Sequence, residues 1–123
     1  MTLPLTPEML EACYDYLNTT PPFNKWNMPS GEDVIFKISR RLKEAGRYQW
    51  DPNTSKHYIQ ASIHGIAYTS SLMRFMAHEM IHLHLQKMGW ESKLRSEDIH
   101  NVAFRKFAAR VCKYHGFDPK AFY

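Results

Sequence analysis

Cysteine is scarce in this sequence. The 123 residues include two, Cys13 and Cys112, which stand far apart and form no C-x-x-C pair. Cysteine zinc knuckles are built from such pairs, so the sequence argues against that kind of metal site. Because small intracellular domains rarely use disulfides, we expect both residues to be buried free thiols, one on the first helix and one on the last.

Long apolar runs are absent as well. No stretch approaches the roughly 20 apolar residues that a membrane-spanning helix needs. The first residues, MTLPLTPEMLEACYDYLN, contain neither a basic start nor an apolar run before a small-residue cleavage site, as a secretory signal would. We therefore expect no membrane partner and a cytoplasmic location. Since 123 residues without internal repeats suffice for one modest core, we also expect a single domain over residues 1–123.

A strong charge of one sign is missing too. The net charge is +4, a mild basic excess. So small an excess predicts a solvated surface first, and weak association with nucleic acid through a basic surface stays open as an alternative. The basic residues gather in two groups, which are Lys37, Arg40, Arg41, Lys43 and Arg47, and then Arg105, Lys106, Arg110 and Lys113.

The first half of the chain predicts one helix and then strands. The helix begins where Thr6 can cap it and Pro7 suits the first helical position, and it ends near Asn18. The β-rich segment 34–39 (VIFKIS) predicts the first strand.

Two further strands are predicted over residues 47–50 and 57–63. The turn-forming residues 51–55 lie between them, so the two strands should form a hairpin. Apolar and polar residues alternate in the second strand, and we expect one of its faces to be buried and the other wet. The apolar set is Ile59, Ala61 and Ile63, and the polar set is Tyr58, Gln60 and Ser62.

Two helices follow the strands. The segment Thr69-Ser70-Ser71 can cap a long helix that runs to about Met88, where Gly89 ends it. Ser96 opens a last helix that runs to about His115, before Gly116. The order helix, three strands, helix, helix predicts a small α+β domain, in which a three-stranded antiparallel or mixed sheet packs against the helices.

The long helix contains the pattern H-E-x-x-H at His78, Glu79 and His82. Residues four apart on a helix lie about 40° apart around its axis, so both imidazoles leave the same face one turn apart. Two nitrogens placed in this way can take two corners of a tetrahedral zinc site. Glu79 lies beside the open position of such a site, where it can act as a general base.

A catalytic zinc ion usually takes three protein ligands, so a third one is expected. We favour His100, which we place in the first turns of the last helix on the inward face, together with Phe104. His84 stands about 200° around the helix from His82, and we expect it to point away from the metal as a surface or second-layer residue. The other candidates are Glu97, which ranks next, and Glu91, Asp98 and His115.

These segments resemble the SprT-like family of metallopeptidases, the family of the bacterial SprT proteins and the protease domain of Spartan. The resemblance covers residues 45–48 (AGRY), the strand at 58–62, the helix at 76–82, and the segment 100–104, where phenylalanine follows a histidine by four residues. One departure is Ile99, since the family commonly has glycine just before the third histidine. The chain also lacks a C-terminal cysteine zinc ribbon, and so resembles a minimal core of the kind found in small phage or bacterial proteins.

The resemblance implies a gluzincin-like α+β core with one zinc ion. It assigns His78, His82 and His100 as metal ligands and Glu79 as the catalytic base. We therefore expect a zinc metallopeptidase that hydrolyses peptide bonds through a zinc-bound water activated by Glu79.

The expected partner is a protein or peptide substrate, lying extended along residues 57–63 as an added edge strand. The residue that stabilises the oxyanion stays open among Tyr68, Arg74 and Tyr114. Two alternatives also stay open. One is a non-catalytic zinc-binding module of phage or bacterial origin that associates with DNA, and the other is a structural domain with an incidental motif.

Overall fold

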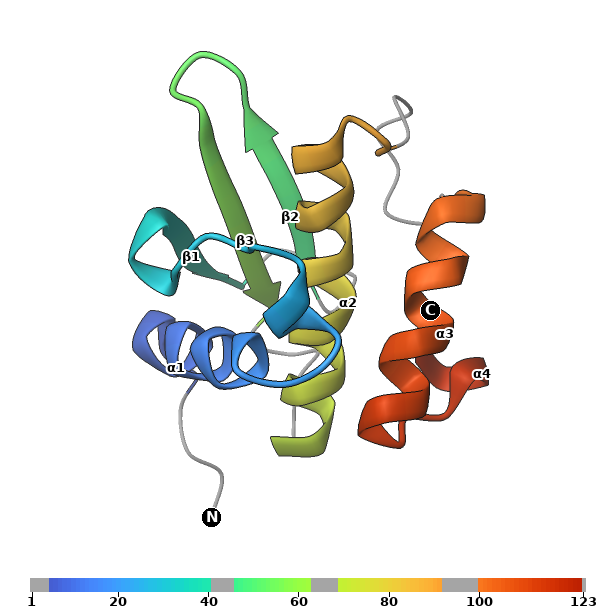
Figure 1. Cartoon of the computed structure of the whole chain (residues 1–123). Coiled ribbons are helices and arrows are strands. Elements are labelled where there is room, and N and C mark those ends of the chain that lie inside the picture. The colour runs from blue at the N-terminus through green and yellow to red at the C-terminus, as the bar shows by residue number, and fades with distance from the viewer. Residues whose placement is uncertain (1–4, 41–45, 63–68, 92–99, 123) are drawn as a thin grey trace.

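The structure, a computed structural model, describes residues 5–40, 46–62, 69–91 and 100–122. It confirms the predicted α+β class. A three-stranded sheet lies on one side of the long helix α2, and α3 and α4 lie on the other side (Figure 1). The elements are α1 (Pro7–Asn18), two short 3-10 helices (Phe23–Lys25 and Gly31–Asp33), β1 (Val34–Ser39), β2 (Gly46–Asp51), β3 (Lys56–Ser62), α2 (Thr69–Met88), α3 (Val102–His115) and α4 (Pro119–Phe122).

The sheet is mixed, and its strand order is β1-β3-β2. β2 and β3 form the predicted antiparallel hairpin, whereas β1 pairs with β3 in parallel. β3 is therefore the central strand, hydrogen-bonded on both sides. The expectation that a peptide would add to residues 57–63 as an edge strand is wrong, because that strand has no open edge.

The alternation along β3 is only partly as predicted. Ile59 and Ala61 are buried, as expected for the inward face. Ser62, on the face predicted to be wet, is buried as well, with 1% of its surface exposed. The predicted alternation therefore holds for Ile59 and Ala61 and fails at Ser62.

α2 is the core of the molecule, and it is apolar around most of its circumference. Met76, Ala77, Met80, Ile81 and Leu83 are all fully buried. A helix is buried all round when other elements cover it on two opposite sides. Here the sheet and α1 lie against one side of α2, and α3 lies against the other (Figure 1). Residues on any face of α2 can therefore reach the interior.

The helix ends follow their local signals with two exceptions. Gly89 and Gly116 end α2 and α3 with φ of +73° and +74°, as predicted. Thr69 lies inside α2 rather than before it. α3 begins at Val102, capped by the Asn101 side chain, and does not extend back over residues 100–101, so the predicted continuous helix from Ser96 to His115 is wrong. Residues 92–99 lie outside the described residues.

The structure also bears on the two cysteines and on membrane-spanning helices. Cys13 and Cys112 are buried free thiols, on α1 and α3, as predicted. Burial raises the pKa of the Cys13 thiol to about 12. Among the described residues, no helix is both long and apolar enough to cross a membrane.

Candidate metal centre

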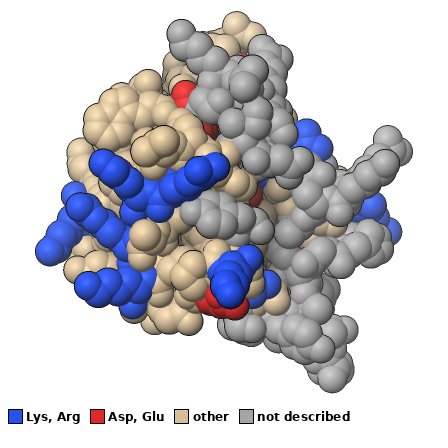
Figure 2. Space-filling model, turned by 90° about the vertical axis from the view of Figure 1, so that its right-hand side faces the viewer, with Lys and Arg blue, Asp and Glu red and all other residues tan. Residues whose placement is uncertain are grey.

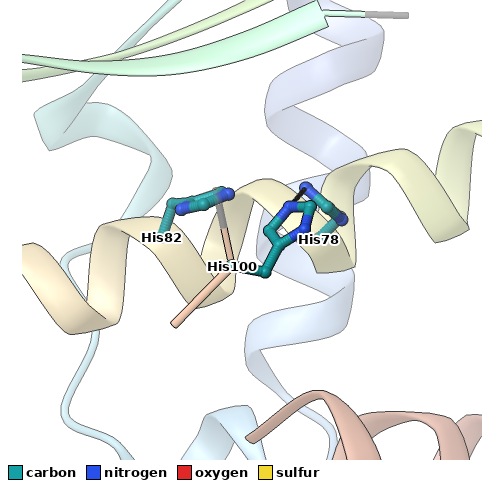
Figure 3. Close-up of side chains that lie close together, drawn as sticks. All are labelled: His78, His82 and His100. Carbon is teal, nitrogen blue, oxygen red and sulfur yellow. Dashed lines mark hydrogen bonds between the residues drawn. The ribbon is translucent and has the colours of Figure 1, made fainter. Parts of the chain in front are cut away.

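α2 presents two imidazoles on one face, as the four-residue spacing requires. The ring centroids of His78 and His82 lie 5.1 Å apart. The helix faces α3 at this point, and Figure 3 shows both rings turned toward the third histidine, His100. The predicted pair is therefore present and points between the helices.

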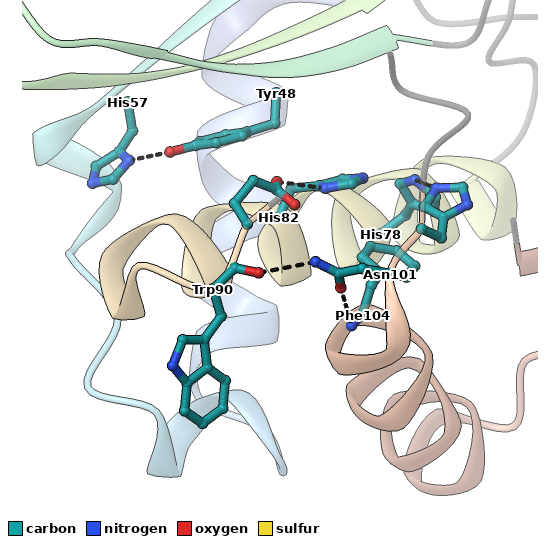
Figure 4. A network of polar contacts seen from close by, with 9 residues as sticks. Tyr48, His57, His78, His82, Trp90, Asn101 and Phe104 are labelled. Carbon is teal, nitrogen blue, oxygen red and sulfur yellow. Dashed lines mark hydrogen bonds and ion pairs between the residues drawn. The ribbon is translucent and has the colours of Figure 1, made fainter. Parts of the chain in front are cut away.

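His100 completes the group from a distant part of the chain. It lies just before α3 and not in a helical turn, so the predicted helical face is wrong, although the His100 ring does reach the other two histidines. Its neighbour Asn101 fixes the segment, because the Asn101 side chain accepts a hydrogen bond from the Phe104 amide at 2.8 Å and donates one to the Trp90 carbonyl at 2.9 Å (Figure 4). The His100 ring packs on Phe104 at 4.4 Å between centroids.

The three histidines offer donor atoms at the spacing that a metal ion requires. One ring nitrogen from each of His78, His82 and His100 lies within 4.8 Å of the others. The Nε2 atoms of His78 and His100 are 3.3 Å apart. With zinc–nitrogen bonds of about 2.0–2.1 Å, two ligands of a tetrahedral ion stand about 3.3 Å from one another. The residues present therefore fit a tetrahedral zinc ion.

In His78 and His82, a hydrogen bond at Nδ1 determines which ring nitrogen is available to bind a metal ion. His78 Nδ1 lies 3.0 Å from the carbonyl oxygen of Phe122, and His82 Nδ1 lies 2.7 Å from Oε2 of Glu91. Because both partners are acceptors, each Nδ1 carries the proton and donates. The Nε2 lone pairs of His78 and His82 are then left to face the space shared with His100.

Electrostatics keep His78 in the form that binds metals. Its pKa is lowered from 6.5 to about 3, mainly by burial and then by the neighbouring His82 and His100, whereas the hydrogen bond to Phe122 acts in the opposite direction. The imidazole is therefore neutral at pH 7, with a lone pair to donate.

Glu79 follows His78 in α2 and is nearly inaccessible, with 2% of its surface exposed. Successive residues of a helix lie about 100° apart, so this carboxylate leaves α2 beside the histidine face. A carboxylate is seldom buried without a partner or a function. The role of Glu79 as general base stays a prediction.

The remaining candidate ligands lie outside the histidine group. His84 points away from it, as predicted, but it is buried rather than exposed, because its ring stacks on Trp26 at 4.3 Å. His115 lies 3.1 Å from the Thr20 hydroxyl and is not a member of the group. Glu97 and Asp98 lie outside the described residues, as does Tyr68 among the candidates for the oxyanion.

Two groups that support the histidines, Glu91 and the Phe122 carbonyl, have roles that the sequence alone does not indicate. Glu91 was considered as a ligand, but its carboxylate meets the outer nitrogen of His82 instead. Phe122 was not considered, since a backbone carbonyl leaves no mark in the sequence. The position of Glu91 just after Gly89, which turns the chain at the helix end, is the one signal that could have suggested its return toward α2.

The fold and the site together define an α+β protein in which a buried helix and a distant segment bring three histidines close enough to hold a metal ion. The chain belongs to the SprT-like family, whose family model matches residues 10–121, nearly the whole chain. That family is associated with metallopeptidase-like domains and with zinc. No curated protein matches the chain.

Proposed function

We propose that the protein is a zinc metallopeptidase that hydrolyses peptide bonds in a protein or peptide substrate. One observation supports this above the others. Nitrogens of His78, His82 and His100 lie within 4.8 Å of one another, and Glu79, the residue after His78 in α2, is buried. Three ligands and an adjacent base make up a catalytic rather than a closed structural site.

The proposed chemistry divides between the ion and the residues. Zinc at such a site supplies a Lewis acid with one open position and lowers the pKa of water there toward about 7. Glu79 accepts the proton of the attacking water through its carboxylate and later gives it to the nitrogen of the leaving amine. The Phe122 carbonyl and Glu91 hold the Nδ1 protons of His78 and His82, so Nε2 of each ring is the atom that would hold the ion.

The strand order changes where the substrate should bind. Within the described residues, β2 pairs with β3 on one side only, and it packs against α2. An extended peptide that hydrogen-bonds to the outer edge of β2 would run alongside the helix that carries the histidines. We therefore place the substrate on β2 in this proposal.

Metal content and activity of single variants test the proposal. We expect one zinc per chain in the wild type, and strong loss of zinc in His82→Ala and His100→Ala. His115→Gln is the matched control, because that histidine lies outside the group, and it should keep its zinc. Retention of zinc by His100→Ala would assign the third ligand to another residue.

Glu79→Gln separates binding from chemistry. It should keep zinc and lose peptidase activity by about 10²–10⁴-fold, since a positioned general base contributes that much. Activity on an unfolded protein such as casein, measured with zinc-loaded enzyme, gives the comparison. If Glu79→Gln cleaved the substrate as fast as the wild type, the assignment of the base would be wrong.

A second candidate is a non-catalytic zinc-binding module that associates with nucleic acid, and the surface of α3 favours it. This helix contains no acidic residue, and its four Lys and Arg side chains are all exposed. Figure 2 looks onto this side of the molecule and shows Lys and Arg side chains gathered on one part of it. The four residues are Arg105, Lys106, Arg110 and Lys113.

Salt dependence tests this candidate. Oligonucleotide binding, followed by fluorescence anisotropy, should weaken steeply as salt rises, and Lys106→Ala and Arg110→Ala should each reduce the slope of log K against log salt by about 1. Lys25→Ala, an exposed lysine on another element, is the control. Zinc binding without turnover, together with this salt slope, would favour the module over the peptidase.

A further inference from the structure

The turn that follows α2 brings a carboxylate back to the helix. Gly89, with φ of +73°, reverses the chain, and the Trp90 amide donates to the Leu85 carbonyl at 2.8 Å. This is the usual geometry of a helix ended by glycine. It places Glu91 alongside the last turns of α2, where Oε2 accepts a hydrogen bond from His82 Nδ1 at 2.7 Å. The dashed line at His82 in Figure 4 marks this bond.

The same turn is fastened to the segment that carries the third histidine. Asn101 donates a hydrogen bond to the Trp90 carbonyl at 2.9 Å, and Asn101 directly follows His100. The backbone on the N-terminal side of Glu91 is therefore tied to the N-terminus of α3. Because the backbone just before Glu91 is held both by α2 and by the start of α3, the Glu91 side chain loses little further conformational freedom when it orients the His82 ring.

Glu91 is not placed to bind the ion itself. Its carboxylate contacts Nδ1 of His82, whereas Nε2 faces the other histidines, and an imidazole directs these two nitrogens to different sides of the ring. Among the described residues, the group with metal-ligand spacing contains His78, His82 and His100 and does not include Glu91.

We propose that Glu91 is a positioning residue of the zinc site, which holds the ring and tautomer of His82 and adds a negative charge behind it. This inference depends on the proposed function in taking zinc as the ion. The charge matters because three neutral imidazoles leave the two positive charges of the ion uncompensated. The other supporting bond, from His78 to the Phe122 carbonyl, fixes a ring without adding charge. A carboxylate behind a metal-bound histidine makes that histidine a stronger donor.

Zinc affinity in a competition titration with a coloured chelator tests the proposal. Glu91→Gln keeps an oxygen that can accept from His82 but removes the charge, and we expect zinc to bind about 10-fold more weakly. Glu91→Ala removes both, and the loss should approach about 100-fold. Glu32→Gln makes the same chemical change at an exposed residue away from the histidines, and it should bind zinc as the wild type does.

A spectroscopic measurement separates positioning from general destabilisation. Cobalt bound in place of zinc should show a shifted visible absorption band in both Glu91 variants, whereas Glu32→Gln should not change it. Circular dichroism of the zinc-free variants checks that they fold. Zinc affinities of Glu91→Gln and Glu91→Ala within twofold of the wild type, with an unchanged cobalt spectrum, would overturn the inference and leave the metallopeptidase proposal intact. A wild type that binds no zinc would overturn both.

Discussion

A single added methyl group at Gly46 should disturb the junction between the sheet and the metal-binding helix. A Cβ at this position would lie 2.2 Å from the Gln60 carbonyl oxygen and 2.3 Å from a ring carbon of Phe75. Gln60 belongs to the paired strand β3, and Phe75 lies on α2 one turn before His78. The substitution Gly46→Ala therefore wedges β2 away from both neighbours at once.

The loss of stability in Gly46→Ala depends on which neighbouring atoms can move away from the added Cβ. The Phe75 ring can turn aside, but the Gln60 oxygen is part of a hydrogen-bonded backbone and cannot rotate away. Restoring an ordinary contact requires the strands to separate by about 1 Å at this point. Overpacking of this kind costs about 1–3 kcal/mol, and the rigid neighbour puts Gly46→Ala near the upper value. A loss of about 3 kcal/mol moves the midpoint of urea unfolding by about 1.5 M at an m value of about 2 kcal/mol/M.

Urea unfolding of zinc-free protein, followed by circular dichroism, measures this loss. Gly89→Ala is the control, because a Cβ there meets nothing within 4 Å and the cost comes from its φ of +73° alone. That conformation costs an alanine about 1–2 kcal/mol. Gly46→Ala should therefore be the less stable of the two. If Gly46→Ala lay within about 0.5 kcal/mol of the wild type, the close packing of β2 on β3 and α2 would be refuted.

Three further predictions concern the site and the core. Ending the chain after Asp118 removes the Phe122 carbonyl behind His78, and zinc binding should weaken about 10-fold in a chelator titration; unchanged affinity would contradict the role of α4. In zinc-free protein, His78 has a folded pKa of about 3 against 6.5 unfolded, so stability is fully present above pH 6.5 and should fall as the pH drops toward 3, by up to about 1.4 kcal/mol per pH unit in urea unfolding. A flat profile would show that His78 titrates normally in the fold. Cys13, with a pKa raised to about 12, should react with iodoacetamide at pH 8 at least about 100-fold more slowly in folded than in denatured protein, as peptide mass spectrometry can measure.

The parts of the fold that could be predicted from the sequence are those set by neighbouring residues. The H-E-x-x-H spacing alone puts His78 and His82 on one face of a helix, and Gly89 and Gly116 end their helices where a left-handed residue is needed. The β2–β3 hairpin also follows from its turn residues. Each of these features depends on a few successive side chains, which a sequence displays directly.

The start of α3 shows where local signals are insufficient. Ser96 and Asn101 are both good N-cap residues, and the sequence does not say which of them caps the helix. The structure uses Asn101, which also donates to the Trp90 carbonyl at the end of α2. That second bond is tertiary and cannot be seen in the local pattern. As a result the sequence predicts a helical face for His100 that it does not occupy, although it packs on Phe104 as expected.

The order of the strands in the sheet could not be predicted from the sequence, for a similar reason. Alternation in β3 predicts which residues face inward, but it does not say whether β1 lies beside β3 or beside β2. The parallel pairing of β1 with β3 depends on how the chain returns across the sheet, and it makes β3 central. Because β3 is central, we propose that the substrate binds along β2 and not along β3.

The metal centre also links parts of the fold that lie far apart in the sequence. Two of its histidines lie on α2, the third precedes α3, and the groups behind His78 and His82 come from α4 and from the turn after α2. An ion bound to all three histidines would tie α3 and its flanking segments to the buried helix. Because such an ion binds the folded chain and not the unfolded one, its binding free energy adds to the free energy of unfolding. The C-terminal third of the chain should therefore gain the most protection from hydrogen exchange when zinc is added, while the β2–β3 hairpin gains less.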